Sequence, residues 1–281
     1  MLDVKCIYNG HLISIHESQI TFSNRAFRYG DSIFESIRLV NGKIMLLNHH
    51  LHRLKLSMNL LSMKIPLEFN ISTIENLIIS LIKSNKVNKD ARIRLTVFRN
   101  EGGYYVPEHN DISYLIEIEK IDAKGYILNQ KGFKLDLFND IKKPISKISN
   151  CKTGSALLYI MAGLTKTSLE LDDCFIINEN EHIIESINSN VFIVKNNVIY
   201  TPPLSDGCID GVMRKNILAL AELNKMLTIE KSITLEILFE ADEVFLTNAI
   251  KGLQWVQSFK NAIYTNRVSL MFNKILNESI H

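Results

Sequence analysis

The chain has 281 residues, of which 46% are hydrophobic and 22% are charged, a composition typical of a folded globular protein. The formal net charge is only +2, and no run of basic residues with interleaved aromatics is present, which argues against a nucleic-acid partner. No basic leader and no apolar run of about 20 residues is found, so neither a secretory signal nor a membrane span is expected. The four cysteines lie far apart in the sequence, which favours a reducing, cytoplasmic location.

The first part of the chain alternates strand and helix patterns. Residues 5–14 have a strand pattern, and residues 22–32 are predicted to form a loop. The Asn41-Gly42 pair predicts a hairpin turn between strands at 33–40 and 43–47. The remaining predicted elements are an amphipathic helix over 48–63 capped by Asn48, a helix over 71–85, and strands over 91–100 and 112–121.

A domain boundary is expected in residues 121–127, which would act as a linker between residues 1–120 and residues 128–281. The smaller N-terminal part is predicted as an α/β domain, and the larger C-terminal part as mixed strands packed by helices. We therefore assign the whole chain to the α+β class. The predicted elements of the second part are a strand at 133–138, a helix in 155–171, hairpins over 174–201, a helix at 211–226, a strand at 243–249 and a helix at 267–276.

A carboxylate, Glu185, interrupts the apolar hairpins of residues 174–201. Such a side chain is either a solvated strand end or a buried charge, and a buried charge is costly unless a cationic or proton-bearing group meets it. A protonated pyridine nitrogen would be a suitable partner, because a carboxylate stabilises the N–H⁺ form and keeps the ring electron-accepting.

Three cationic or N–H-rich positions invite functional interpretations, each with a simpler alternative. Lys152 precedes a predicted helix, where desolvation could lower the pKa of the amine and make it a nucleophile towards aldehydes, although most lysines are solvated. Gly211 leads into a helix whose first N–H groups could bind an anion. Arg53 could donate two hydrogen bonds to a phosphate, although most helix arginines are solvated.

Two further patterns are given structural interpretations. His49 and His52 share a helical face, but no third ligand accompanies them, so no metal site is predicted. The glycine pair within residues 101–105 lacks the strand and helix context of a phosphate loop, and a hairpin loop is favoured there.

Taken together in chain order, these motifs resemble the fold-type IV, or class IV, pyridoxal-phosphate enzymes. This family includes branched-chain and D-amino acid aminotransferases and 4-amino-4-deoxychorismate lyases. The matching segments span nearly the whole chain and read RYGDSIFESIR, HHLHRL, CKTGSALLY, ESINSNVF, GVMR and ADEVFLTNA. The resemblance implies a two-domain fold, pyridoxal 5'-phosphate as cofactor, amino acid and 2-oxo acid substrates, and a homodimer.

The resemblance also implies roles for individual residues. Lys152 would be the Schiff-base lysine that moves the Cα proton, and Glu185 would pair with the pyridine nitrogen. Arg53 would hold the cofactor phosphate together with the backbone N–H groups of Val212 and Met213.

Further cofactor contacts are implied at Asn190 and in the segment 247–249. Asn190 would lie beside the cofactor. Ala249 stands where the family has a phosphate-binding threonine, so Thr247 and Asn248 are the alternatives for that contact. The substrate positions implied by the resemblance are Tyr29, Phe34, Ser36, Arg38 and Arg94.

The resemblance leaves two reactions of the family open, that of an L-amino acid aminotransferase and that of a 4-amino-4-deoxychorismate lyase. Glu35, Arg38 and Arg94 resemble the branched-chain enzymes and favour an L-amino acid aminotransferase. Ser36 and the segments GVMR and TNA instead resemble the lyases, which release pyruvate and 4-aminobenzoate. Leu157 stands where the branched-chain enzymes have a tyrosine that contacts the ring.

Two other activities are not favoured. Residues 101–109 lack the Arg-x-His pattern that D-amino acid enzymes use for the substrate carboxylate, so D-specific activity is not expected. A non-catalytic protein that only binds the cofactor or a partner is a third hypothesis, which the presence of both Lys152 and Glu185 argues against.

Overall fold

The chain forms two compact units in a computed structural model that describes residues 4–17, 20–278 and 280. The first unit runs to Gly125 and also contains residues 151–155, while the second contains residues 126–150 and the chain from 156 onwards. The change of unit at Gly125 falls inside the predicted linker. Residues 151–155 were predicted with the second domain but belong to the first unit, because their backbone pairs there with a strand of the sheet.

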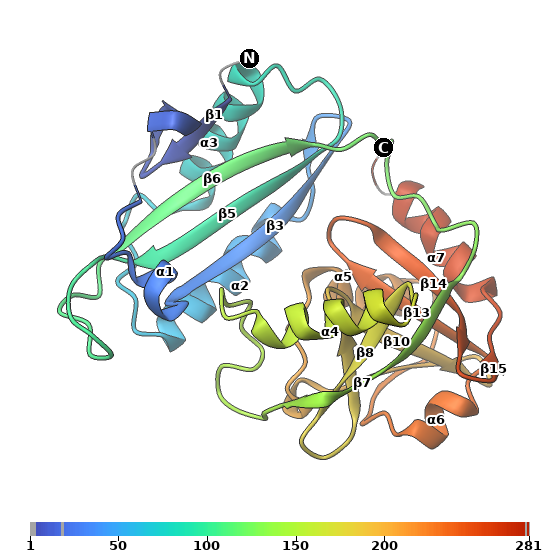
Figure 1. Ribbon diagram of the computed structural model, residues 1–281. Coiled ribbons are helices and arrows are strands. Elements are labelled where there is room, and N and C mark those ends of the chain that lie inside the picture. Colours follow the sequence, from blue (N-terminus) through green and yellow to red (C-terminus); the bar gives the residue numbers. More distant parts are fainter. Residues whose placement is uncertain (1–3, 18–19, 279, 281) are drawn as a thin grey trace. The chain divides into compact units, whose positions relative to one another are not determined.

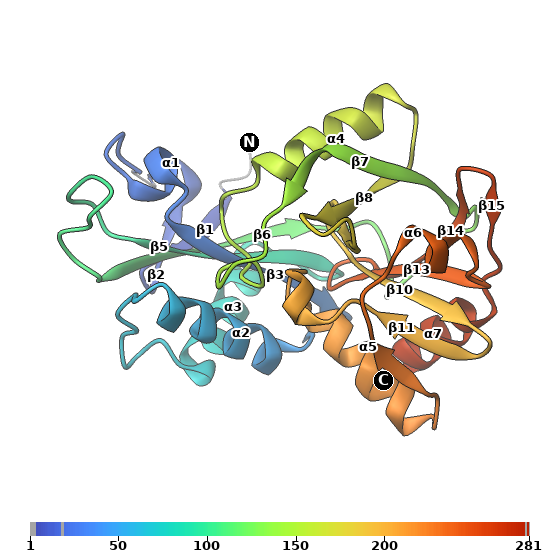
Figure 2. The ribbon, with the colours of Figure 1, turned by 90° about the horizontal axis from the view of Figure 1, so that it is seen from below.

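The first unit is built on a sheet with two helices on one face (Figure 2). The strand order is β2-β1-β6-β5-β3-β4. The strands are β1 (Lys5–Tyr8), β2 (His11–Ser14), β3 (Ser32–Val40), β4 (Lys43–Ile44), β5 (Ala91–Arg99) and β6 (Ile112–Lys120). The helices are η1 (Ile15–Glu17), α1 (Arg25–Tyr29), α2 (Leu47–Leu60) and α3 (Ile71–Ser84), of which α2 and α3 cover the apolar face.

Alternation along β3 separates the core of this unit from its functional face. Ile33, Ile37 and Leu39 pack into the core beneath α2 and α3. Phe34 and Ser36 point to the opposite face, because successive side chains of a strand alternate.

Local sequence chemistry explains one success and two errors of prediction. The Asn41-Gly42 hairpin is confirmed, with both residues at positive φ. A short helix, α1, forms where a loop was predicted, because the Asn24 side chain accepts hydrogen bonds from the N–H groups of its first turn. The predicted cap at Asn48 is wrong: α2 starts one residue earlier, after Leu46 in the left-handed conformation.

The second unit contains a sheet that closes on itself (Figure 1). The strand order is β12-β11-β10-β13-β14-β7-β8-β9, and β9 pairs back onto β10 at Glu185 and Asn190. The strands are β7 (Phe133–Lys143), β8 (Asp173–Asn178), β9 (Ile183–Ser186), β10 (Asn190–Lys195), β11 (Val198–Thr201), β12 (Thr228–Glu230), β13 (Glu243–Asn248), β14 (Gly252–Phe259) and β15 (Ala262–Ile263), the last paired with β14.

The helices of the second unit lie on two sides of this sheet. They are α4 (Leu157–Ser168), η2 (Leu204–Asp206), α5 (Val212–Leu223), α6 (Leu235–Phe239) and α7 (Arg267–Glu278). Helix α4 packs along β7 and β8, whereas α5 and α7 pack against β13 (Figure 1). None of the helices in the described part of the chain is long and apolar enough to cross a membrane. The four cysteines are buried and free.

Candidate active site

The segment that carries Lys152 is held by β3 through backbone pairing. The N–H of Phe34 donates to the Lys152 carbonyl at 2.9 Å, and the N–H of Gly154 donates to the Ser32 carbonyl at 2.8 Å. Gly154 leaves room for the Ser32 hydroxyl, since a Cβ atom at this position would lie 2.2 Å from that oxygen and the hydroxyl would have to move. The backbone of Lys152 is therefore fixed against the sheet of the first unit.

Two cations share the ring of Phe34. The Lys152 ammonium lies 4.5 Å from the ring centroid, and the Arg94 guanidinium carbon lies 3.8 Å from it. Burial, with the nearby charge of Arg92, lowers the pKa of Arg94 from its ordinary value. Ser36 pairs with Arg94 across β3 and β5, and its hydroxyl accepts a hydrogen bond from Arg92 at 3.4 Å. The structure thus brings Phe34, Ser36 and Arg94 together with Lys152.

Arg38, the next predicted substrate residue on β3, has a structural environment. Its side chain is 2% exposed. Its guanidinium donates to Asp90 at 2.7 Å and to the carbonyls of Ala123 and Gly125, where the chain leaves the first unit. This environment indicates that Arg38 anchors the end of the unit, in place of the predicted substrate contact.

Tyr29, the remaining predicted substrate residue, lies at the end of α1. Its ring centroid is 5.6 Å from that of Tyr105, and the Arg25 guanidinium lies over the Tyr29 ring. Arg25 also donates to the carbonyls of residues 102–104. Tyr29 is therefore part of a cluster that fixes the loop between β5 and β6.

Arg53 lies on α2 and is oriented by Glu35, a contact that the sequence did not predict. Glu35 accepts hydrogen bonds from two guanidinium nitrogens of Arg53 and, at 2.6 Å, from Nδ1 of His50. Burial alone would raise the pKa of Glu35, but the charge of Arg53 and the hydrogen bonds from both partners outweigh it and lower the pKa to about 2. Burial lowers the pKa of His50, so we assign a neutral ring that donates through Nδ1.

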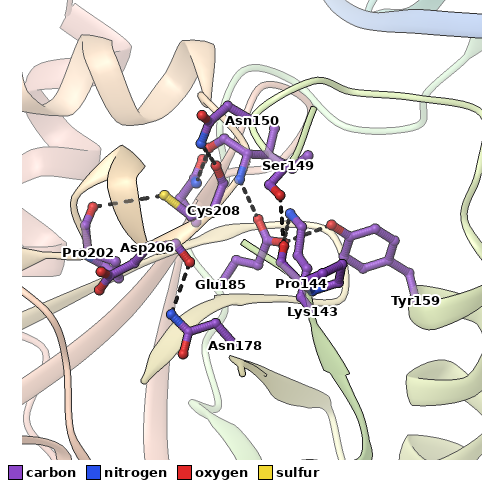
Figure 3. A network of polar contacts seen from close by, with 12 residues as sticks. Lys143, Pro144, Ser149, Asn150, Tyr159, Asn178, Glu185, Pro202, Asp206 and Cys208 are labelled. Carbon is purple, nitrogen blue, oxygen red and sulfur yellow. Dashed lines mark hydrogen bonds and ion pairs between the residues drawn. The ribbon is translucent and has the colours of Figure 1, made fainter. Parts of the chain in front are cut away.

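Glu185 is 2% exposed, so of the two alternatives it is the buried charge and not a solvated strand end. Its Oε1 accepts hydrogen bonds from the Lys143 ammonium and the Tyr159 hydroxyl, both at 2.7 Å (Figure 3). Its Oε2 accepts one from the N–H of Ile209 at 2.8 Å. Burial, together with the Glu185 charge, raises the pKa of Tyr159 well above its ordinary value, so the phenol stays protonated.

A bulge in β9 explains why this carboxylate faces α4. Ile177 pairs with Ile183 and Ile176 pairs with Glu185, so Ile184 is an extra residue on β9. Ile184 packs in the cluster beneath α4, and Glu185 bonds to Tyr159 of α4. Both consecutive side chains therefore lie on the α4 side, which a regular strand would not allow.

The N-terminus of α5 leaves donors for an anion. Gly211 precedes the helix, and no side chain caps it. A Cβ at Gly211 would lie 1.7 Å from Oδ1 of Asn190, whose amide nitrogen donates to the Ile209 carbonyl. Glycine is therefore required for Asn190 to lie against the start of the helix, where the N–H groups of Val212 and Met213 begin the first turn.

Thr247 pairs with Asn190 across β10 and β13, and within the described residues its buried hydroxyl has no hydrogen-bond partner. The side-chain amide of Asn248 is instead already hydrogen-bonded to the adjoining loops: it donates to Ser189 and accepts from the N–H groups of Ile250 and Lys251. Thr247 and Asn248 are the two alternatives to the phosphate-binding threonine that the family has at position 249. Of these, Thr247 has a side-chain hydroxyl that makes no hydrogen bond within the described residues. Ala249 offers only its backbone, and its carbonyl accepts from Tyr126.

A comparison with family models matches residues 32–259 to "Amino-transferase class IV". The chain belongs to the class IV aminotransferases. A Methanocaldococcus jannaschii protein assigned as a branched-chain-amino-acid aminotransferase is 26% identical over 267 residues, covering 94% of this chain and 91% of its own. The D-alanine aminotransferase of Bacillus licheniformis is 27% identical over 252 residues, covering 87% and 84%.

Solved structures of class IV enzymes share this fold. The branched-chain aminotransferase of Thermoproteus uzoniensis, solved with norvaline, has a TM-score of 0.87 at 21% identity and covers 97% of this chain and 93% of its own. A Legionella pneumophila protein assigned as a 4-amino-4-deoxychorismate lyase has a TM-score of 0.82 at 23% identity, covering 94% and 96%. The predicted two-domain fold-type IV architecture is confirmed.

Class IV aminotransferases use pyridoxal 5'-phosphate, and the residues of this chain fit that cofactor. The uncapped start of α5 and the unpartnered hydroxyl of Thr247 suit a phosphate. The buried carboxylate of Glu185 suits a protonated ring nitrogen, and the amine of Lys152 suits the aldehyde.

Lys143, Tyr159 and Glu35 are the polar partners that the sequence did not reveal. Lys143 and Glu185 are 42 residues apart and meet only because of irregular strands. Glu35 was noted as a residue shared with the branched-chain enzymes, but its role as the partner of Arg53 and His50 was not predicted.

Proposed function

We propose that the chain transfers the amino group of an L-amino acid with a branched side chain to a 2-oxo acid. The observation that carries this proposal is the placement of Lys152 and Arg94 on one ring, that of Phe34. The Arg94 guanidinium would bind the substrate carboxylate. The Lys152 amine would then lie close to Cα, the carbon that bears that carboxylate and loses a proton in the reaction.

Each residue has a defined task in this reaction. Bound pyridoxal phosphate supplies an aldehyde that condenses with amines and a ring that accepts electrons from the substrate carbon. Lys152 would be the residue that takes and carries the proton of the substrate Cα. Glu185 would hold the proton on the ring nitrogen, and Thr247 and the first turn of α5 would hold the phosphate. Arg53 stays a predicted phosphate ligand.

The second candidate is a 4-amino-4-deoxychorismate lyase. It is favoured by the Ser36 hydroxyl, which lies across the strand pair from Arg94 and accepts from Arg92. A lyase would use the same proton transfer by Lys152 and then release pyruvate and 4-aminobenzoate.

We also propose a cytoplasmic location, supported by four buried thiols that form no disulfide.

The choice between these reactions is tested by product analysis. Protein loaded with pyridoxal phosphate is offered L-leucine with 2-oxoglutarate, D-alanine with 2-oxoglutarate, and aminodeoxychorismate, and glutamate and pyruvate are measured. We expect glutamate from L-leucine. Pyruvate from aminodeoxychorismate without glutamate from L-leucine would replace the first candidate with the second.

The role of Lys152 has its own spectroscopic test. We expect a visible absorbance band in the loaded protein, and we expect Lys152→Ala to abolish both the band and the activity, because the amine is removed. The exposed Lys147 serves as the control, since Lys147→Ala removes the same charge from a nearby position but should keep the band. A band that survives Lys152→Ala would reject the assignment.

A further inference from the structure

Lys143 is a buried cation that the proposed reaction does not yet use. It ends β7 and is 8% exposed. The register between β7 and β8 shifts between Phe138 and Lys143, and this irregularity brings its ammonium within 2.7 Å of Glu185. The preceding residue, Lys142, points away and pairs with Glu181, whose side chain is 74% exposed.

The hydrogen bonds of Glu185 are divided unequally between its two oxygens. Oε1 accepts from Lys143 and Tyr159 (Figure 3). Among the described residues, Oε2 accepts only from the N–H of Ile209. An ionised carboxylate offers about four acceptor positions, two on each oxygen. Three are filled by the chain, and the fourth, on Oε2, remains for a further donor.

Without a cofactor, Lys143 is the cation closest to this buried carboxylate among the ion pairs of the described residues. Tyr159 donates a hydrogen bond but cannot supply a positive charge, because a protonated phenol is neutral; burial and the Glu185 charge raise the pKa of Tyr159 and keep that proton in place. A buried carboxylate that loses its cationic partner is strongly destabilising. Lys143 is therefore the chain's own cationic partner for Glu185, at 2.7 Å, before any ligand arrives.

We propose that Lys143 is a positioning residue that holds Glu185 by Oε1 and leaves Oε2 for the protonated ring nitrogen of pyridoxal phosphate. The two cations then share one carboxylate through different oxygens, so their contributions are coupled. This inference rests on the proposed function only for the identity of the ring nitrogen.

The coupling is measured by thermal unfolding of wild-type, Lys143→Met and Lys142→Met proteins, without cofactor and with saturating pyridoxal phosphate. Without cofactor, we expect the Tm of Lys143→Met to lie about 6 °C or more below that of Lys142→Met, because only the former strands a buried carboxylate. With cofactor, we expect most of this gap to close, since the ring nitrogen then supplies the missing cation. Lys143→Arg keeps a cation and should behave as wild type.

A cofactor analogue distinguishes compensation by the ring nitrogen from general stabilisation of the fold by any bound ligand. The 1-deaza analogue of pyridoxal phosphate has carbon in place of the ring nitrogen, and we expect it to raise the Tm of the wild-type protein but to leave the Lys143→Met gap open. If Lys143→Met does not fold without ligand, refolding yields with the two compounds give the same comparison. Recovery with pyridoxal phosphate alone supports the inference, and equal yields with both compounds reject it.

The remaining outcomes separate this inference from the proposed function. An equal rise of Tm with pyridoxal phosphate in all variants would overturn the role of Lys143 and leave the proposed function intact. A wild-type protein whose Tm does not respond to pyridoxal phosphate would overturn both.

Discussion

Thr247 and Glu185 illustrate two ways in which a side chain can be prepared for a ligand. Glu185 is buried with three donors around it, so its charge is stabilised before binding. Thr247 is buried with an unpartnered hydroxyl within the described residues, so its hydrogen bond remains to be made. A buried polar group without a partner costs free energy, and a ligand that supplies the partner recovers it.

Thr247→Val should therefore separate stability from binding. We expect the cofactor-free protein to be as stable as wild type or more stable, because an unpartnered hydroxyl is replaced by a methyl group, while the Kd for pyridoxal phosphate rises about tenfold. Urea unfolding and equilibrium dialysis measure the two quantities.

The matched control is Thr201, a buried threonine whose hydroxyl donates to the Val191 carbonyl. Thr201→Val should lower stability and leave the Kd unchanged. Unchanged cofactor affinity in Thr247→Val would remove Thr247 from the phosphate site.

The sequence revealed the residues whose chemistry conflicts with their surroundings and missed their partners. Glu185 stood out as a carboxylate among apolar strand residues, and Lys152 by the family motif around it. Lys143 could not be found in the same way, because a lysine near the end of a strand is ordinary. Only the strand irregularities give it a carboxylate to contact.

Elements of this chain are joined by polar contacts at functional positions. Glu35 of β3 links to His50 and Arg53 of α2, so the helix that carries the predicted phosphate ligand is tied to the strand that pairs with the Lys152 segment. The position of Arg53 therefore depends on the protonation of its neighbours.

Acid should weaken this link. His50 has a folded-state pKa below its ordinary 6.5, and Glu35 has one of about 2 against an ordinary 4.5, so at both sites the unfolded chain binds protons first as the pH falls. The Glu35 contribution is complete above about pH 4.5 and is lost on approach to pH 2. We expect the free energy of unfolding to fall throughout this range.

Urea unfolding of wild type and Glu35→Gln at pH 7, 5 and 3 tests this effect. The variant should be less stable at pH 7 and should lose less stability below about pH 4.5. The exposed Glu75 of α3 gives the control, since Glu75→Gln should follow the wild-type profile. Parallel profiles for wild type and Glu35→Gln would contradict the assignment of Glu35.

Regular elements were predictable because each leaves a local pattern. The Asn41-Gly42 hairpin and the helix at α5 follow from turn chemistry and apolar periodicity. The bulge at Ile184 leaves no such pattern, since its residues are as apolar as those of a regular strand. The face on which Glu185 lies was therefore beyond prediction from the sequence.

At the scale of the whole molecule, α4 carries apolar side chains that face solvent. Leu157, Ile160 and Leu164 are 73%, 55% and 60% exposed and follow each other at helical spacing. Such a stripe is typical of a surface that another chain covers. It supports the expectation of a homodimer, which stays a prediction.

The double substitution Ile160→Glu and Leu164→Glu should convert a dimer to a monomer, because four charges would be buried in the symmetric interface. Light scattering after size-exclusion chromatography measures the mass. Leu223→Glu, which changes an isolated leucine that is 78% exposed on α5, should remain dimeric. A wild-type protein of single-chain mass would refute the expectation.

The chain passes between its two units three times, after Gly125, after Asn150 and after Ser155. A fragment that ends at Gly125 would therefore lack Lys152 and leave the Phe34 N–H without its acceptor. Cutting the gene once cannot release either unit whole. If the chain is divided after Gly125, the second polypeptide carries residues 151–155 and would have to dock them onto the first polypeptide to regain function. Fragment complementation would therefore report on how that segment docks.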